Sequence, residues 1–90
     1  MKIPNYVQKI VDIAKKNKIR VEKIKSPVDE DATWCVIVDH LDVDYLSQIA
    51  ERKLGLNFDD GSTDYAMMFT DEDESVCICS PDYCYFANND

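Results

Sequence analysis

Residues 33–39 read TWCVIVD and residues 43–55 read VDYLSQIAERKLG, and these two neighbouring stretches decide the fold. The first is apolar on both of its alternating faces, which is typical of a central strand covered on both sides. Its two faces consist of Trp34, Val36 and Val38, and of Cys35 and Ile37. The second stretch repeats apolar residues at three- and four-residue spacing and closes with a glycine, as an amphipathic helix does. The sequence therefore predicts a central strand followed at once by a helix over Val43–Leu54, with Asp42 as its N-cap.

The flanking sequence continues the same two patterns. Upstream, three-and-four spacing predicts a helix over Tyr6–Asn17 with Asn5 as N-cap and with Asn17 in a left-handed turn at its end. Alternation then predicts a strand over Ile19–Lys25, in which Ile24 breaks the pattern and so indicates a bulge or an edge position. Downstream, four extended pieces are expected: Leu56–Phe58, Tyr65–Thr70, Ser75–Ser80 and a final short strand over Tyr83–Ala87.

The element order is thus α-β-β-α-β-β, with one more strand where the last extended piece forms. It predicts an α+β fold in which two helices pack on one face of a four- or five-stranded, mainly antiparallel sheet. Two helices cover only one face of such a sheet. The opposite face is therefore expected to hold a smaller second cluster, or to be covered by a partner.

Length and composition limit what this fold can contain. Ninety residues with 46% apolar content correspond to one domain over residues 1–90, with one thin core. No apolar run approaches the ~20 residues of a membrane span, and the N-terminal segment is amphipathic instead of an apolar signal core. We therefore expect a cytoplasmic protein without membrane association.

The residue inventory argues against most enzyme classes. Two glycines cannot supply a dinucleotide-binding fingerprint, and one histidine cannot build a two-histidine zinc motif. His40 between Asp39 and Asp42 is the one arrangement that resembles a general base, but a solvated loop before the helix, in which Asp42 or Asp39 is the cap, explains it more simply. The sequence predicts a non-enzymatic protein without a cofactor.

Four cysteines stand at positions 35, 77, 79 and 84. Cys77 and Cys79 form a C-x-C pair within an apolar run, whereas structural zinc sites usually space their ligands more widely on a turn. Residues at this spacing share one face of a strand, which suits packing. The expectation is buried structural thiols and no metal site; a disulfide or a metal is the alternative.

Charge is divided unevenly along the chain. Residues 1–25 hold eight basic and two acidic side chains, and residues 26–90 hold two basic and sixteen acidic ones, which gives the net charge of −8. Lys2, Lys9 and Lys16 recur at seven-residue spacing on one exposed face of the basic N-terminal segment and are expected to balance acidic loops. The candidate partner-binding residues lie in three acidic turns: Asp29, Glu30 and Asp31; Asp59, Asp60 and Asp64; and Asp71, Glu72, Asp73 and Glu74.

Acidic turns of this kind favour two hypotheses over a calcium or magnesium site, because four adjacent acids cannot all converge on one ion. The leading hypothesis is an inhibitor or immunity-type protein that blocks a basic surface, such as that of a nuclease, by charge mimicry, without binding nucleic acid itself. In size, acidity and α+β character the chain is similar to small phage-encoded inhibitors of restriction and CRISPR nucleases, and no motif extends this likeness. The alternative is a regulatory or structural domain that forms a homodimer through an exposed sheet face, its acidity serving solubility.

Overall fold

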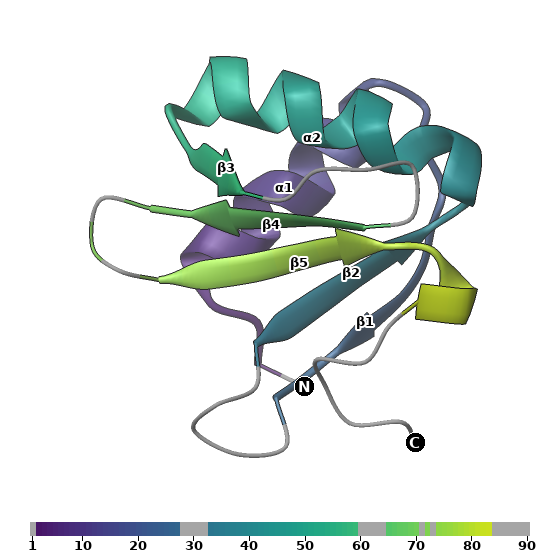
Figure 1. The fold of residues 1–90 in the computed structure, drawn as a ribbon, viewed down its shortest axis with the longest axis horizontal. Helices are drawn as coiled ribbons and strands as arrows, with labels where there is room; N and C mark the ends of the chain where they lie inside the picture. The colour runs from purple at the N-terminus through teal and green to yellow at the C-terminus, as the bar shows by residue number, and fades with distance from the viewer. Residues whose placement is uncertain (1, 28–32, 60–64, 71, 73, 84–90) are drawn as a thin grey trace.

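The computed structural model describes residues 2–27, 33–59, 65–70, 72 and 74–83. Within them it places two helices, five strands and one short 3₁₀ helix (Figure 1). In chain order these are α1 (Asn5–Lys16), β1 (Val21–Lys25), β2 (Trp34–Val38), α2 (His40–Leu54), β3 (Asn57–Asp59), β4 (Tyr65–Phe69), β5 (Ser75–Cys79) and η1 (Pro81–Tyr83). The predicted boundaries are correct to within one to three residues. Tyr83 belongs to η1 instead of a strand, and the rest of the predicted last strand lies outside the described residues.

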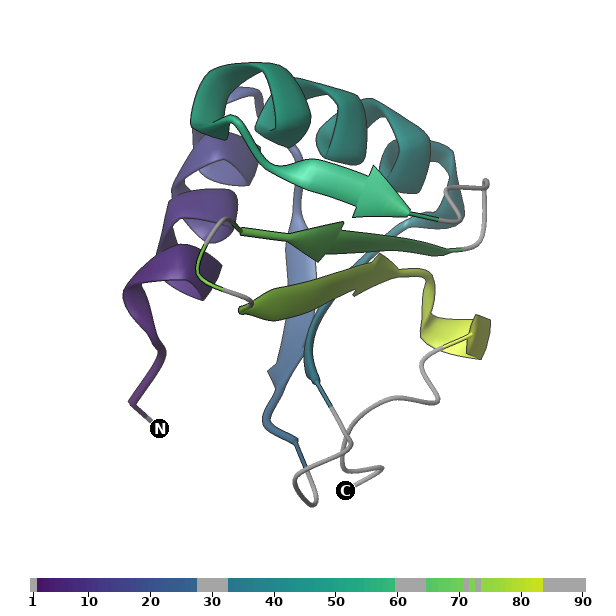
Figure 2. The same cartoon turned by 60° about the vertical axis from the view of Figure 1, so that its left-hand side comes forward.

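The strands form one sheet in the order β1-β2-β5-β4-β3. Strands β2 and β5 pair in parallel at its centre, and the other three pairings are antiparallel. Both helices lie on the same side of the sheet, as the two views in Figures 1 and 2 show. The predicted α+β architecture, with two helices on one face of a mainly antiparallel sheet, is therefore confirmed, and the sheet has five strands.

A pair of hydrogen bonds fixes the start of the central parallel pair. The Thr33 hydroxyl donates to the Ser75 carbonyl oxygen at 2.8 Å and lies 2.9 Å from the Ser75 hydroxyl. In the register that follows, Cys35 is opposite Cys77 and Ile37 is opposite Cys79. Since paired residues in neighbouring strands share a face, this register sets the composition of both faces at once.

Pro4 takes the place of the predicted cap Asn5 in α1, and α2 is capped by Asp39, the other of its two candidate residues. Pro4 occupies the N-cap of α1, and its carbonyl accepts from the amides of Val7 and Gln8 at 3.1 and 2.9 Å. Asn5 is the first residue with helical geometry. Pro4 precedes it in an extended conformation, and no side chain caps this end of the helix. In α2 the cap is Asp39, whose carboxylate accepts from the Leu41 amide at 2.9 Å. The Asp42 amide donates to the Asp39 carbonyl at 2.8 Å and so lies inside the first turn.

Of the two predicted C-terminal helix ends, that of α2 is confirmed and that of α1 is not. Gly55 closes α2 in the left-handed region with φ of 67°, where a residue without a Cβ is unstrained. At the end of α1 the predicted left-handed residue is wrong: Asn17 has φ of −101°, and Lys18 takes φ of 60°. The Asn17 side-chain amide donates to the Ile13 carbonyl at 2.8 Å, a bond that satisfies one of the last helical carbonyls.

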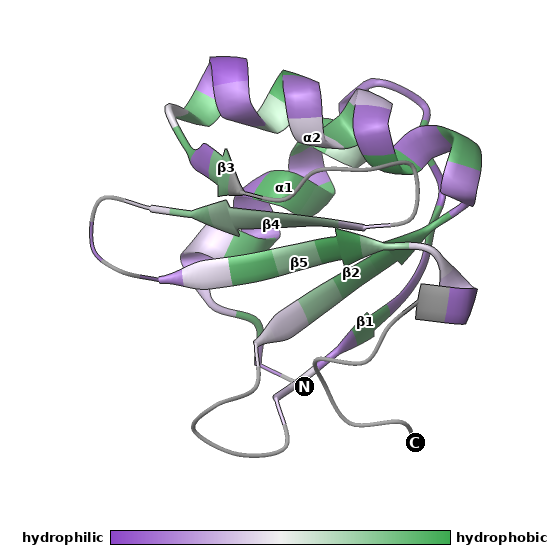
Figure 3. Ribbon diagram, viewed as in Figure 1, coloured by the Kyte–Doolittle hydropathy of each residue, from purple (hydrophilic) through white to green (hydrophobic). Residues whose placement is uncertain are grey.

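The two sheet faces carry two separate apolar clusters. The helix-face core joins both helices to alternate strand positions; its strand members are Val36, Val38, Met68, Val76 and Ile78. On the opposite face lies the open-face cluster, which consists of Cys35, Ile37, Cys77 and Cys79, with Tyr65 and Met67 packed against it. Figure 3 shows the hydrophobic colouring concentrated along β2 and β5. The predicted second cluster is therefore present, and its four central members are buried.

Two predicted features of individual strands have different outcomes. Strand β1 is an edge strand, and its register shifts between Val21 and Lys23, so the bulge and the edge position are both confirmed. Trp34, which the apolar pattern of its strand predicts to be largely buried against Ile10 and Leu46, is only half-buried against the helix-face core. It is the first residue of β2, so it lies at the end of the strand and not at its centre.

Candidate functional site

A hollow of about 470 Å³ lies where the turn between β4 and β5 meets the two helices. The start of α1, the end of α2 and the turn contribute its walls: Asn5, Tyr6, Lys9, Leu54, Gly55, Leu56, Thr70, Glu72 and Glu74. It therefore brings residues from three separate parts of the sequence to one place. Two of them, Glu72 and Glu74, belong to the predicted acidic surface.

Hydrogen bonds to Thr70 hold the turn that carries these two acids. The Thr70 hydroxyl accepts from the amides of Glu72 and Glu74, both at 3.2 Å. The Thr70 amide in turn donates to the Glu74 carbonyl at 2.9 Å. Threonine hydroxyls that bond to the backbone a few residues ahead stabilise turns. These bonds hold the backbone of Glu72 and Glu74 at the wall of the hollow.

The two acids differ in their surroundings. Glu72 is exposed, whereas Glu74 is half-buried near Tyr6. Partial burial, and to a smaller extent the negative charge of Glu74, raise the pKa of the Tyr6 hydroxyl above its ordinary value of 10.0. The phenol therefore stays neutral at physiological pH and keeps its proton available for a hydrogen bond. Lys9, which is exposed, adds one positive side chain to the same wall.

The structure describes three of the ten predicted partner-binding residues. It brings Glu72 and Glu74 together at the hollow, and it places the backbone of Asp59 at the end of β3. The other predicted residues lie outside the described residues: Asp29, Glu30, Asp31, Asp60, Asp64, Asp71 and Asp73. Sequence reasoning missed Tyr6 and Thr70 as members of the site. A threonine directly before an acidic run is the signal that could have revealed the turn.

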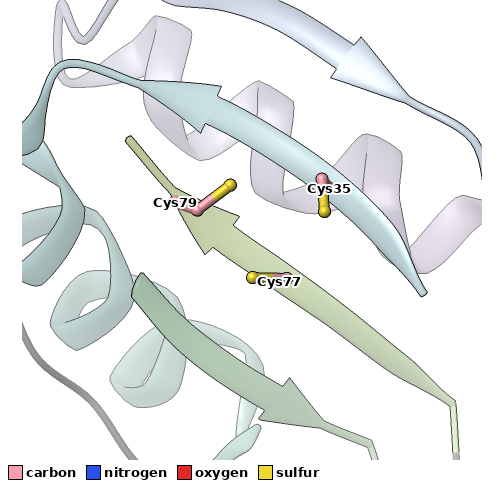
Figure 4. Close-up of side chains that lie close together, drawn as sticks. All are labelled: Cys35, Cys77 and Cys79. Atoms are coloured by element: carbon pink, nitrogen blue, oxygen red, sulfur yellow. The ribbon is translucent and has the colours of Figure 1, made fainter. Parts of the chain in front are cut away.

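A second group of functional side chains lies within the open-face cluster. The sulfur atoms of Cys35, Cys77 and Cys79 all lie within 4.8 Å of one another (Figure 4). All three side chains are fully buried and none of them is in a disulfide, so the predicted burial is confirmed for these three. Cys84 lies outside the described residues. The C-x-C spacing revealed two thiols on one face, and the parallel pairing with β2 brings the third.

The thiols interact with one another and with their surroundings. Hydrogen bonding with Cys35 and then with Cys77, together with burial, raises the pKa of the Cys79 thiol. The Cys35 sulfur also lies 4.0 Å from the Thr33 carbonyl oxygen, a weak hydrogen bond. These contacts favour the protonated form of the Cys79 thiol. Chemically the arrangement offers three soft donor atoms in one apolar place.

Two positively charged residues border the thiol group on the edge strand. Lys25 is the register partner of Cys35, and Lys23 is the register partner of Ile37. Register partners in an antiparallel pair share a face, so both lysines lie on the open-face side. Ile24 between them packs against the helix-face core, which agrees with this alternation.

His40, which resembled a general base in the sequence, is the first residue of α2. Its Nδ1 lies 3.6 Å from the Asp39 carboxylate, and the two side chains are 63% and 60% exposed. The same carboxylate caps the helix through the Leu41 amide. The geometry therefore shows Asp39 serving the helix start, in a solvated position.

The predicted lysine stripe is exposed along its length, at Lys2, Lys9 and Lys16. Among the helices that the structure describes, neither has the combined length and apolarity that crossing a membrane requires.

The chain matches no protein-family model, no curated protein and no solved structure.

Proposed function

We propose that this protein is a small, non-enzymatic binding protein that blocks a basic, nucleic-acid-binding surface of another protein, as inhibitor and immunity proteins do. The observation that supports the proposal most directly is the hydrogen-bonded turn that holds Glu72 and Glu74 at the edge of a hollow. A turn whose backbone is held in this way presents its acidic side chains at a lower entropic cost than a turn without such bonds, because less chain has to be ordered when a lysine or arginine binds.

The charge distribution gives the proposed surface a long-range effect. The basic residues belong mostly to the first 25 positions, whereas the acidic excess belongs to the rest of the chain. The net charge of −8 attracts a basic surface over a long range, and the acidic turns add to this attraction. Because this attraction is screened by salt, the association should be sensitive to ionic strength.

The hollow itself suits one basic side chain of the partner. Glu72 and Glu74 offer carboxylates, and the ring of Tyr6 lines the same wall, so an arginine could contact both kinds of group. Lys9 also lines the hollow and repels an incoming cation. The proposed contact therefore makes opposite predictions for two neighbours: loss of the acids weakens binding, whereas loss of Lys9 strengthens it.

Binding of a short fluorescent arginine-only peptide tests the acidic surface directly, with a glutamine peptide of the same length as the control ligand. We expect binding at about 0.01 M salt that is lost at about 1 M, where the Debye length falls from about 30 Å to about 3 Å. The double variant Glu72→Gln/Glu74→Gln should slow association more than it speeds dissociation. Lys9→Gln should strengthen binding, mainly through faster association, because it removes a charge that repels the peptide. The protein should also displace a labelled DNA duplex from the peptide. Charge mimicry requires the protein to occupy the same arginine side chains that the DNA phosphates contact.

A charge-matched variant separates the proposed site from net charge. Asp12→Asn/Asp44→Asn also removes two negative charges, from exposed positions on α1 and α2. It should bind the peptide within about twofold of the original protein, because only general attraction is reduced. Equal weakening in both double variants would show that the acids act through net charge alone. A salt-insensitive dimer in sedimentation measurements, without peptide binding, would favour the dimerising domain instead.

A further inference from the structure

We propose that Cys35, Cys77 and Cys79 form a binding site for a monovalent copper ion, which the three sulfurs hold in trigonal coordination. The inference is independent of the acidic turn, since it rests on the open-face cluster. Its starting point is the convergence of three thiols from two parallel strands within 4.8 Å of one another. Figure 4 shows the three side chains on the same side of β2 and β5.

The distances are close to those that a shared ion requires. In a triangle whose sides are at most 4.8 Å, the centre lies within about 2.8 Å of each corner. Bonds between thiolate sulfur and a small soft metal ion are about 2.3 Å long. Each sulfur therefore has to move by about 0.5 Å, which small side-chain rotations can supply without any change in strand register.

The donor atoms select the kind of metal. Thiolate and thioether sulfur favours Cu(I), zinc and iron–sulfur clusters over hard cations. Among the residues that the structure describes, the group contains three thiols and neither a histidine nor a carboxylate. Zinc in proteins is almost always bound by four ligands in a tetrahedron, whereas three sulfurs in a plane suit Cu(I). Met67, the register partner of Cys77, adds a thioether to the wall of the site.

Binding exchanges three protons for one ion. A cysteine binds a metal ion as the thiolate, so each of the three thiols gives up its proton when the ion binds. Three S–H bonds break, three Cu–S bonds form, and three protons pass to solvent, while the copper arrives and remains as Cu(I). The product carries a charge of −2, which would be costly to bury alone. Lys23 and Lys25 on the neighbouring strand provide two compensating positive charges.

Titration of the reduced, metal-free full chain with Cu(I) under anaerobic conditions, against the competing chelator bicinchoninate, tests the proposal. We expect one Cu(I) per chain and an X-ray absorption spectrum that shows three sulfur neighbours at about 2.3 Å. Retention of all copper by the chelator would overturn the proposal. A preference for Zn(II) over Cu(I) in the same competition would overturn the assignment of the metal.

Three single variants locate the site. Cys35→Ala, Cys77→Ala and Cys79→Ala should each lower the Cu(I) affinity at least a hundredfold, since even changes outside the ligand shell cost about 10–100-fold. The three-thiol site also predicts that Cys84→Ala, at a cysteine outside the described residues, stays within threefold of the original protein. Circular dichroism verifies the fold of each variant, and any one folded member of the three is sufficient for the test. Copper binding that survives Cys77→Ala but is lost in Cys84→Ala would refute the three-thiol site.

The lysines provide a second measurement that a merely structural role of the cysteines would not affect. Lys23→Gln/Lys25→Gln should weaken Cu(I) binding about tenfold with an unchanged stoichiometry, because the anionic complex loses its nearest positive charges. Lys15→Gln/Lys16→Gln removes two charges from the exposed end of α1 and should have little effect. Equal affinities in the two double variants would contradict the electrostatic part of the proposal.

Discussion

The two faces of the sheet are built from the same strands, yet they have different chemistry. On the helix face, β2 and β5 present Val36, Val38, Val76 and Ile78, which are branched hydrocarbons. On the open face the intervening positions of the same two strands are Cys35, Ile37, Cys77 and Cys79. Both sets are buried to a similar degree. The difference therefore cannot be explained by burial alone.

The comparison shows what each face requires of its side chains. Two helices dock on the helix face, so its side chains have to interlock with those of α1 and α2, and branched residues with few rotamers do this well. The open face has no described helix against it. Small polarizable thiols can occupy it with less dependence on shape. We infer that interlocking packing on the helix face contributes most to stability, whereas the thiols of the open-face cluster contribute less.

The substitution Ile78→Ala tests this inference where the effect is largest. Ile78 lies between Cys77 and Cys79 on β5 and is fully buried in the helix-face core. We expect it to lower the free energy of unfolding by about 2–5 kcal/mol, because a large cavity forms between the sheet and the helices. Urea denaturation of the metal-free protein measures the change.

Cys77→Ala is the control on the neighbouring position and the opposite face. It removes a single sulfur atom, so a loss of roughly 1 kcal/mol is expected in the absence of metal. A loss as large as that of Ile78→Ala would mean that the open face is also a core built for packing. In that case the division between the two faces would have to be abandoned.

Thr33→Val addresses the register that assigns residues to faces. The Thr33 hydroxyl joins two segments that are 42 positions apart, through its bonds to Ser75. Its loss should cost about 1 kcal/mol, since valine has the same shape but leaves the Ser75 groups without this partner. Ser47→Ala is the matched control: its hydroxyl bonds within α2, to the Asp44 carbonyl at 2.9 Å, and its loss should be nearly neutral. Identical effects would show that the Thr33 bonds do not help to hold the central pair.

The smallest expected effect on stability is the pH dependence that Tyr6 contributes. Tyr6 packs at the border of the helix-face core and lines the acidic hollow. Its raised pKa means that the folded protein keeps the phenolic proton at a pH where the unfolded chain has begun to lose it. The stability contributed by the protonated phenol is therefore complete below pH 10 and declines as the pH rises through the pKa of the folded state. The difference in phenolate absorbance between the original protein and Tyr6→Phe follows this titration.

Glu74→Gln separates the two causes of the shift. Removing the negative charge should lower the pKa of Tyr6, but the value should remain above 10.0 because burial is the larger cause. An unchanged titration curve would show that Glu74 does not act on the phenol, and the proposed arrangement of the hollow would then be incorrect.

Much of the fold could be predicted from local patterns. Apolar residues at every second position located the strands, and apolar residues three and four positions apart located the helices. One buried side of an element is enough to produce either pattern. The caps were less predictable: Asp39 and Asp42 are equally suitable residue types, and only the chain path after β2 decides between them. The pairing of β2 with β5 was not readable either, because it joins distant segments and depends on tertiary packing.

The candidate sites divide in the same way. The acidic run at 71–74 was visible as composition, and its turn follows from the preceding Thr70. The contribution of Tyr6 from the other end of the chain could not be foreseen without the packing of α1. Likewise, the thiol group exists only because the parallel register places Cys35 opposite Cys77. Spacing within one strand cannot reveal a ligand that arrives from another strand.

The two outermost strands have a consequence for how the molecule meets others of its kind. An unpaired edge is a template onto which a further strand can be added, and this is a common route to aggregation. Strand β1 interrupts its own edge with the register shift after Val21 and carries Lys23 and Lys25, while β3 at the other border is only three residues long. Both borders thus discourage the addition of a strand. The sheet should therefore not grow by the addition of strands from other copies of the chain, even at high protein concentration.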